Sequence, residues 1–503
     1  MSPFPISELT IAGFHNALRQ QQTTCAAVVR AYLARIAEYD HTLKAILCLN
    51  PDAERLATQK DTETTELLKR NEPFPRLHGV PIVLKDNFGT FGLPTTAGTK
   101  ALANMRTRED SDVVAQLLRA GAIILGKTNL HEFAMHGTTV SSLGGQTLNP
   151  YDLSRTPGGS SGGTGAALAA NLALVGTGTD TNNSLRSPAS ACAIVGFKPT
   201  WGVVPLRGIV PVSETQDCAG PMARTVEDVR VVFDVMRGET QTQTQTQNYS
   251  RSSGRKLRIG ILDAYFGVEE KDHEGTELQV ENAEIQSTVR KALASFQEEN
   301  KETVTLVPIA ASSHEDWSFA NLRENADTQC FEFKFCLDEF LQSPLIEHSD
   351  HRSLASVADS GNYDKQAVTA PFDAALKDPV TFSRTSEAYR ARLQRIKVLK
   401  EEVQRVFDDN QLDVLAYPHQ RRLVVPTGGT PQAGRNGILA ALTGRPAICL
   451  PAGFSSPSTS APKGVPIGLE FLGFEHRDDE LLDLAARVED VLRARKEPDM
   501  NVV

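Results

Sequence analysis

The sequence predicts an α/β fold in which a central β-sheet is covered by helices on both faces. From about residue 78, short apolar runs alternate with helical patterns that carry capping residues. This alternation is typical of strands and helices in α/β proteins. The chain has 503 residues, of which 40% are hydrophobic, so it can bury a large core without disulfides or metals. A chain of this length can form one large α/β unit.

Each element is predicted from a local pattern. Residues 1–40 predict two helices, the second of which has apolar residues at helical spacing. The apolar run 79–84 predicts a short buried strand. Asp110 or Ser111 can cap a following helix, and Gly121 ends it. Further strands are predicted at 122–125, 172–175, 257–262, 303–309, 412–417, 447–450 and 466–472, and further helices at 280–297 and 478–496.

Charge, cysteine content and terminal composition exclude several classes of protein. There are 52 Lys and Arg against 62 Asp and Glu, so the formal charge is −10, which does not suit a general nucleic-acid binder. The seven cysteines are scattered and form no C-x-x-C pair, which predicts neither a disulfide framework nor a zinc knuckle. The N-terminus lacks the pattern of a signal peptide, and no apolar run is long enough for a membrane span. We expect a cytoplasmic protein with no membrane or nucleic-acid partner.

The glycine- and serine-rich run at 157–164 is the most unusual segment, and a small-residue helix is expected after it at 166–173. It lacks both the Walker pattern and the G-x-G-x-x-G of phosphate-binding loops. Residues 158–162 match the G-x-S-x-G of a nucleophile elbow, but the residues before them predict a loop and not a strand end. A flexible linker would not continue directly into a buried helix. Four glycines around two serines indicate backbone and hydroxyl groups crowded close to another group.

Two further polar features stand at predicted strand ends. Pro188 suits the first turn of a helix, so Ser184 lies at a strand-to-helix junction, where free N–H groups favour the negative charge of an oxyanion. An ordinary turn is the alternative. Lys85 directly follows the run 79–84. Burial would lower its pKa and make the neutral amine a base, whereas an ion pair with Asp86 or a solvent-facing strand end is the alternative.

Together, these features and their order resemble the amidase signature family, whose members use a Ser–Ser–Lys triad without histidine. The resemblance spans most of the chain. It implies a mixed central sheet and a hydrolase that needs no metal or cofactor, acting on carboxamide C–N bonds through an acyl-enzyme. The matching segments are 79–86, 126–135, 158–163, 184–189, 196–200, 220–228, 446–453 and 466–470. Residues 332–334 and 337–341 look more like stand-alone fungal and peptide-amidase relatives than the glutamine-amidotransferase subunit.

The resemblance also implies the role of each site residue. Ser184 would be the acylated nucleophile, Ser160 the bridging serine held by a cis peptide, and Lys85 the neutral general base. Backbone N–H groups of Thr181, Asn182, Asn183 and Ser184 would form the oxyanion hole. Met135, Gly158, Gly159 and Ser161 would contact the substrate. Arg186 and Asp217 are expected to form a structural ion pair under the site.

The chain departs from the family pattern at Asn182 and Asn183, where Gly-Gly is usual. Asn is the best non-glycine substitute for a left-handed backbone, so we expect the loop to close at a cost of about 1 kcal/mol. The added carboxamides would then narrow the acyl pocket or donate a hydrogen bond. A damaged oxyanion hole is the alternative consequence.

The composition of the chain and the resemblance together divide it into four expected parts. They are an N-terminal helical segment packing on the core (1–75), the amidase signature core (76–238), a low-complexity polar surface loop (239–256) and the C-terminal part of the same α/β domain (257–503). Within the last part, the charged helical stretch at about 310–410 is expected to shape the substrate pocket.

A possible zinc motif is rejected at 131–136. His131 and His136 are five residues apart, which is about 140° around a helix, so their imidazoles are expected to diverge. No metal site is therefore predicted.

The predicted activity is amide hydrolysis with a small-molecule amide as the partner. Three alternatives remain, namely a glutamine-amidotransferase-type subunit, a carbamate hydrolase and a catalytically impaired amidase-like binding protein. A homodimer is compatible with the sequence.

Overall fold

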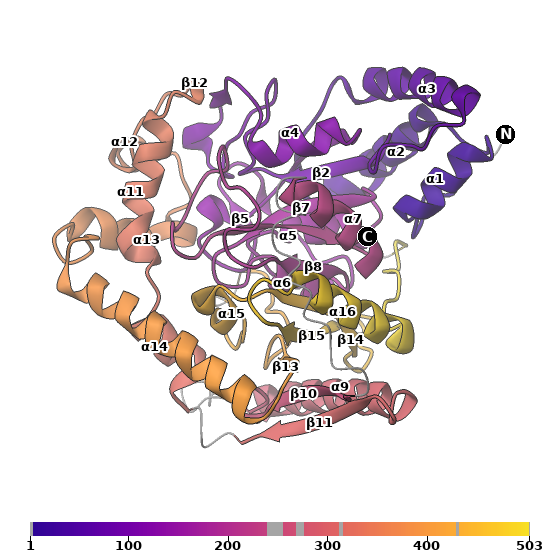
Figure 1. Ribbon diagram of the computed structural model, residues 1–503. Coiled ribbons are helices and arrows are strands. Elements are labelled where there is room, and N and C mark those ends of the chain that lie inside the picture. Colours follow the sequence, from indigo (N-terminus) through magenta and orange to yellow (C-terminus); the bar gives the residue numbers. More distant parts are fainter. Residues whose placement is uncertain (1–3, 239–254, 268–275, 311–314, 429–431, 502–503) are drawn as a thin grey trace.

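The computed structural model describes residues 4–238, 255–267, 276–310, 315–428 and 432–501 (Figure 1). All but the last two residues of the predicted low-complexity loop 239–256 lie outside the described residues. None of the helices in these ranges combines the length and apolar composition that crossing a bilayer requires.

One mixed sheet of eleven strands forms the centre of the molecule. β2 pairs in parallel with both β4 and β7, and β10 pairs in parallel with β13 and β11. The intervening pairs from β7 to β13, and the pair β1–β4, are antiparallel. From edge to edge the order is β1 (Ile46–Leu49), β4 (Ile123–Thr128), β2 (Pro81–Lys85), β7 (Val175–Asp180), β9 (Cys218–Ala223), β8 (Val195–Lys198), β14 (Ala447–Phe454), β15 (Pro466–Leu472), β13 (Val414–Pro418), β10 (Leu257–Leu262) and β11 (Val304–Ile309). The predicted α/β class and mixed sheet are confirmed.

Helices pack on this sheet in two groups. α4 (Asp112–Arg119), α7 (Val226–Arg237), α16 (Asp478–Leu492) and α9 (Thr276–Glu299) lie side by side in that order, with α7 on β9 and both α16 and α9 on β14. α5 (Gly162–Ala169) packs on β7 and β2, and α6 (Arg186–Ala191) packs on β8, β14 and β15. The N-terminal helices are α1 (Ile11–Arg19), α2 (Cys25–Leu43) and α3 (Ala53–Arg70), of which α3 contacts β4.

A further group of helices lies to one side of the sheet, drawn from salmon to orange in Figure 1. It consists of α11 (Gln329–Gln342), α12 (Leu354–Ser360), α13 (Lys365–Lys377) and α14 (Glu387–Asp409); the short α10 (Phe319–Asn325) and α15 (Ile438–Thr443) contact α14. A separate apolar cluster that includes Phe133, Phe333 and Phe372 joins this group to the segment before α5. The remaining short elements are β3 (Arg106–Thr107) paired with β12 (Ile346–His348), β5 (Val140–Ser141) paired with β6 (Gly145–Gln146), and 3₁₀ turns at Lys100–Leu102, Glu132–Ala134, Asp263–Tyr265 and Glu315–Trp317.

The strand predicted at 172–175 and the helix predicted at 166–173 are displaced. The helix begins at Gly162, and the strand is Val175–Asp180. The apolar residues 172–174 are buried in the connection between them. Small residues in β7 allow close packing, since a Cβ on Gly176 would lie 2.5 Å from Thr164 of α5. Tertiary packing therefore overrides the weak strand propensity of glycine here.

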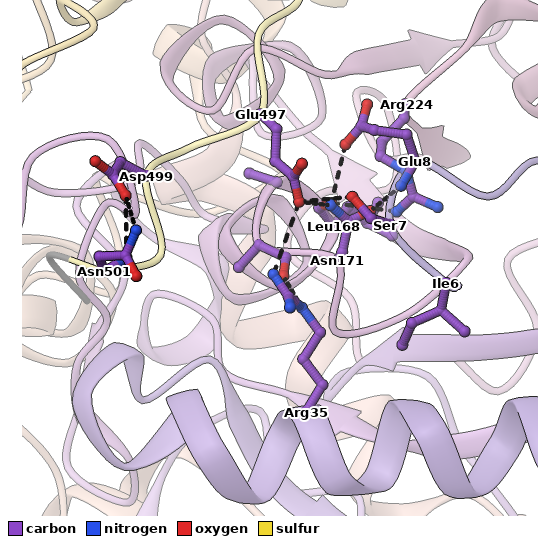
Figure 2. A network of polar contacts seen from close by, with 12 residues as sticks. Ile6, Ser7, Glu8, Arg35, Leu168, Asn171, Arg224, Glu497, Asp499 and Asn501 are labelled. Atoms are coloured by element: carbon purple, nitrogen blue, oxygen red, sulfur yellow. Dashed lines mark hydrogen bonds and ion pairs between the residues drawn. The ribbon is translucent and has the colours of Figure 1, made fainter. Parts of the chain in front are cut away.

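A polar network ties the two ends of the described chain together next to α5 (Figure 2). The carboxylate of Glu497 accepts hydrogen bonds from Ser7 Oγ at 2.8 Å and Asn171 Nδ2 at 2.9 Å, and Arg35 lies 3.8 Å from it. Asn171 Nδ2 also donates to Glu8 at 3.0 Å. Because Asn171 lies just after the C-cap of α5, these contacts hold the C-terminal end of the helix that begins next to the serine pair.

Candidate active site

Lys85 and Ser160 form the central contact of the site. Lys85 is the last residue of β2, and its Nζ lies 2.8 Å from Ser160 Oγ and 2.7 Å from Thr179 Oγ1. Asn87 Nδ2 donates to the same Thr179 oxygen at 3.0 Å. The ion pair considered between Lys85 and Asp86 is not formed, because Asp86 pairs with Lys127 at 3.1 Å. The lysine is therefore held by hydroxyl groups on a rigid strand.

The environment of Lys85 favours its neutral form. The side chain is fully buried, and burial lowers its pKa to about 7, although the charges of Asp180 and Asp217 oppose the shift. A neutral amine has a lone pair that can accept the proton of the nearby Ser160 hydroxyl. The structure thus places a base of suitable pKa against a serine.

The serine pair lies at the start of α5, after a loop whose conformation requires glycine. The Gly159–Ser160 peptide bond is cis, as the family resemblance implies. Gly158 has a φ of +72°, and a Cβ there would lie 2.9 Å from Ser187 O. Thr139 Oγ1 donates to Gly158 O at 2.7 Å. Gly158, Gly159 and Ser161 are packed beneath the site, where Ser161 Oγ donates to Thr179 O at 3.3 Å.

Ser184 lies in the connection between β7 and α6, as its predicted strand-to-helix position requires. The Ser161 N–H donates to Ser184 O at 3.3 Å, which joins this connection to the serine pair. In the described part of the chain, no hydrogen bond joins the Ser160 and Ser184 hydroxyls, and the N–H groups of 182–184 donate to no acceptor. Three consecutive N–H groups, the last of them that of Ser184 itself, therefore have no acceptor in the described part of the chain.

A buried ion cluster holds both ends of this connection. Asp180 accepts from Leu185 N and from two nitrogens of Arg186, while Arg186 also donates to Asn182 O at 2.8 Å and to Glu470 of β15. The expected ion pair between Arg186 and Asp217 is wrong. Asp217 instead accepts from Thr181 Oγ1 at 2.6 Å and from the N–H groups of 212 and 213.

Asn182 and Asn183 do not have the left-handed backbone expected for them, since neither has a positive φ. Asn182 is held by its side chain, which accepts from Gln216 at 3.1 Å and donates to Asp327 at 3.3 Å. Asn183 is buried, and a Cβ on Gly437 would lie only 2.5 Å from the Cβ of Asn183. The loop therefore accommodates two side chains without backbone strain, because the facing residue is glycine.

A cavity of about 120 Å³ opens above Ser184. It is lined by Met135 and residues 181–184, together with residues of α10, α11, α14 and the segment before α15. Lys85 and Ser160 are not among the described residues that line it. A second cavity of about 440 Å³ reaches Asn87, Thr179 and Thr181 from another direction.

The two histidines at 131 and 136 meet, contrary to prediction. The segment between them is a 3₁₀ turn with positive φ at Phe133 and Ala134, so the helical rotation assumed for them does not apply. Their rings lie edge to face with centroids 5.4 Å apart. Burial lowers the pKa of His136 to about 4. Among the described residues, no cluster of three or more His, Cys, Asp or Glu could hold a metal ion.

The sequence patterns did not identify four residues that support the site. Thr179 binds the lysine, Asn87 donates to Thr179, and Asp180 and Glu470 hold Arg186. The alternation of Gly and Thr along 176–179 is the signal that could have revealed Thr179, because alternate residues of a strand face one side. Glu470 ends the matching segment 466–470, but no local pattern identifies it as a partner of Arg186, which is 284 residues away.

Comparisons with known proteins agree with this geometry. The Amidase family model matches residues 27–482. The chain is 32% identical to a glutamyl-tRNA(Gln) amidotransferase subunit of Microcystis aeruginosa, over 95% of this chain and 96% of that protein. The peptide amidase of Stenotrophomonas maltophilia superposes with a TM-score of 0.80 and 29% identity, covering 99% of this chain and 100% of that one. An amidase family protein of Bacillus anthracis gives a TM-score of 0.76 and 25% identity over 98% and 93%. The chain therefore belongs to the amidase signature family, as an enzyme that hydrolyses carboxamide bonds through a Ser–cisSer–Lys triad.

Proposed function

We propose that Ser184 is the nucleophile, Ser160 the proton bridge and Lys85 the general base in hydrolysis of a small-molecule carboxamide. The observation that carries these roles is the 2.8 Å contact between Ser160 Oγ and a buried Lys85 amine. Neutral Lys85 accepts a proton from Ser160 as Ser160 accepts one from Ser184, and Ser184 Oγ bonds to the carbonyl carbon. The proton returns to the amine as the C–N bond breaks, and water then hydrolyses the ester.

The N–H groups of 181–184 are proposed to stabilise the negative oxygen that forms during this attack. The free N–H groups of 182–184 support this role, and oriented donors of this kind stabilise an oxyanion without reorganisation. Met135 lies beside them in the cavity wall, so we assign it a substrate contact. Gly158, Gly159 and Ser161, predicted to contact the substrate, are not among the described residues that line the cavity, so we assign them to the loop that positions Ser160.

Labelling with a fluorophosphonate tests the assignment directly. Modification mapped to Ser184 is expected, because this probe traps an activated serine nucleophile. Labelling carried out well below the Lys85 pKa of about 7 should be much slower than at neutral pH, since protonated Lys85 cannot act as the base. Modification of Ser160 or Ser161 in place of Ser184 would contradict the assigned roles.

The pH dependence of hydrolysis should follow the protonation of Lys85. Below its pKa of about 7 the lysine is protonated, so kcat/KM should fall about tenfold for each pH unit of acidification. Above the pKa the rate should level off. Asp217→Asn should move the inflection to lower pH, because the Asp217 charge favours the protonated lysine. Steady-state measurement of kcat/KM on one amide at pH values below and above 7 tests this prediction. A kcat/KM that does not change with pH would contradict it.

Replacing both asparagines by glycine should leave hydrolysis of a small amide within about tenfold of the parent, or about 1.4 kcal/mol. The reason is that the backbone of 182–183 needs no left-handed geometry. The variant should accept bulkier acyl groups, because both side chains line the cavity. kcat on short and bulky acyl amides measures both effects. A gain of about a hundredfold on the short amide would instead indicate a damaged oxyanion hole in the parent.

Gly437→Ala should lower kcat by about tenfold to a hundredfold, because small displacements of catalytic groups have effects of this size. The new Cβ would lie 2.5 Å from Asn183 Cβ and 2.9 Å from Arg186, so the oxyanion loop must shift. Adding Asn183→Gly should restore part of the loss. Gly267→Ala is the matched control, since a Cβ there meets no atom within 4 Å. Unchanged kcat in Gly437→Ala would show that this contact does not position the loop.

The chain is proposed to act alone on a small amide, in the cytoplasm, and as a homodimer if it assembles. Its similarity to peptide amidase over 99% of the chain supports stand-alone hydrolysis. The amidotransferase subunit is the second candidate, favoured by the full-length similarity to the Microcystis aeruginosa protein. Hydrolysis of simple amides by the purified chain distinguishes the two, because an amidotransferase subunit requires partner proteins. A carbamate substrate would use the same acyl chemistry.

A further inference from the structure

The cavity above Ser184 has an excess of positive charge. Three arginines line it, Arg323, Arg392 and Arg435, against a single carboxylate, Asp327. This contrasts with the whole chain, whose formal charge is −10. A cluster of like charges beside a nucleophile needs a partner of opposite charge when the site is in use.

Arg435 is the unusual member of this set. The residue is only 7% exposed, yet within the described ranges its side chain makes no hydrogen bond or ion pair, and its Nε is buried without a partner. Two other buried arginines are paired, since Arg186 binds two carboxylates and Arg445 donates to Gly473 O and Gln404. An arginine is rarely buried unpaired, because desolvation of its charge is costly.

The chain also makes room for the Arg435 side chain. A Cβ on Gly137 would lie 2.0 Å from an Arg435 terminal nitrogen. Gly137 in turn packs closely against Gly159, next to the serine pair, since a Cβ on Gly159 would lie 3.0 Å from the carbonyl carbon of Gly137. The guanidinium therefore lies in a space that glycine keeps open, at the wall of the cavity that holds Ser184.

The other charged groups of the cavity do not neutralise Arg435. Asp327 accepts from Asn182 and Gln329. Arg392 donates to the backbone carbonyls of 324 and 327. Burial, and then the charge of the exposed Arg323, lower the pKa of Arg435 to about 10, so it remains a cation at neutral pH.

We propose that this cavity binds a carboxylate of the substrate through Arg435, with Arg323 adding attraction from the rim. The proposal rests on the assigned amide hydrolysis and names its substrate class, an amide that carries a negative charge close to the scissile bond. A planar guanidinium can pair with both oxygens of a carboxylate. The carboxylate belongs either to the acyl part or to the amine part of the substrate, and the two cases are separated by experiment.

Two matched pairs of amides provide the test. Glutaramate against glutaramide places the charge on the acyl side, and N-acetylglycine against N-ethylacetamide places it on the amine side. On one pair the wild-type enzyme should prefer the anion by about tenfold or more in kcat/KM, as charged hydrogen bonds imply. Arg435→Gln should lower the ratio of anionic to neutral kcat/KM by about 30-fold or more, because a buried charge loses its partner. Arg323→Gln should lower the same ratio by a smaller factor.

Arg445→Gln is the matched control, because Arg445 is similarly buried and its pKa is also lowered to about 10, but it lies outside the cavity. Its ratio should equal that of the wild type. The ratio is independent of the fraction of folded enzyme, so partial misfolding of a variant does not disturb it. Equal rates on the anion and its neutral counterpart in both pairs, or a ratio unaffected by Arg435→Gln, would overturn the proposal while leaving amide hydrolysis intact.

A binding measurement keeps the proposal separate from catalysis. The Ser184→Ala protein should bind glutaramate or N-acetylglycine in calorimetry, and Ser184→Ala/Arg435→Gln should bind it at least about tenfold more weakly. If the wild type hydrolyses neither pair, the binding measurement alone decides whether the carboxylate site exists. The absence of hydrolysis then counts against the proposed function. Equal binding by the two proteins, or binding of neither anion by the Ser184→Ala protein, would overturn the carboxylate site.

Discussion

Ser184→Ala is expected to lower kcat/KM for any accepted amide by at least about 10³-fold. The attacking oxygen is lost, while Lys85 and Ser160 keep their 2.8 Å contact. Ser160→Ala and Lys85→Ala should cause losses of similar order, because the three groups transfer one proton as a unit. The double variant Ser184→Ala/Lys85→Ala should therefore be hardly less active than either single variant.

Ser187→Ala is the matched control for this experiment. Ser187 lies three residues beyond Ser184 and is buried, but its hydroxyl has no hydrogen-bond partner among the described residues. Its replacement should have little effect on kcat/KM. Steady-state kinetics of all four single variants test the assignment, and near wild-type activity in Ser184→Ala would disprove it.

The sequence was sufficient to predict the α/β class and to select three residues from distant segments. Lys85 follows an apolar run, Ser160 lies in a glycine-rich run, and Ser184 precedes a proline-containing helix start. Each of these signals is local, so the residue can be identified without knowledge of the fold. The strand bounds at 257–262 and 466–472 were also correct, because their apolar runs coincide with complete buried strands.

Features that depend on contacts between distant segments could not be predicted in this way. β7 has small polar residues because α5 packs closely on it, so its strand pattern is weak. The rings of His131 and His136 meet because the chain turns at Phe133 and Ala134. A helical wheel cannot describe such a turn. One of the two partners of Arg186 was missed for the same reason, since Glu470 comes from β15, far along the chain.

The ion cluster around Arg186 links stability to the active site. Arg186, Asp180 and Glu470 are fully buried. Burial opposes ionisation of both carboxyl groups, but the Arg186 charge outweighs it and holds the pKa of Asp180 and of Glu470 below their usual values. The stabilisation from such carboxylates is present above their unfolded pKa values, and it is lost as the pH falls through the lowered folded values. Tyr417 and His419 also contact Glu470, at 3.1 and 2.5 Å.

Arg186→Met should lower the free energy of unfolding by about 3–5 kcal/mol at neutral pH, because two buried carboxylates lose their cation. The deficit should shrink as the pH falls towards about 4, where the carboxyl groups of the variant become protonated and uncharged. Glu470→Gln in the Arg186→Met background should recover part of the loss. Arg207→Met is the control, since Arg207 pairs with Glu109 and Asp112 at the exposed surface, where an ion pair contributes little to stability. Urea unfolding of the four proteins at neutral and acidic pH measures these differences. If Arg186→Met and Arg207→Met were equally stable, or if the deficit were independent of pH, the cluster would not stabilise the loop between β7 and α6 by its charge.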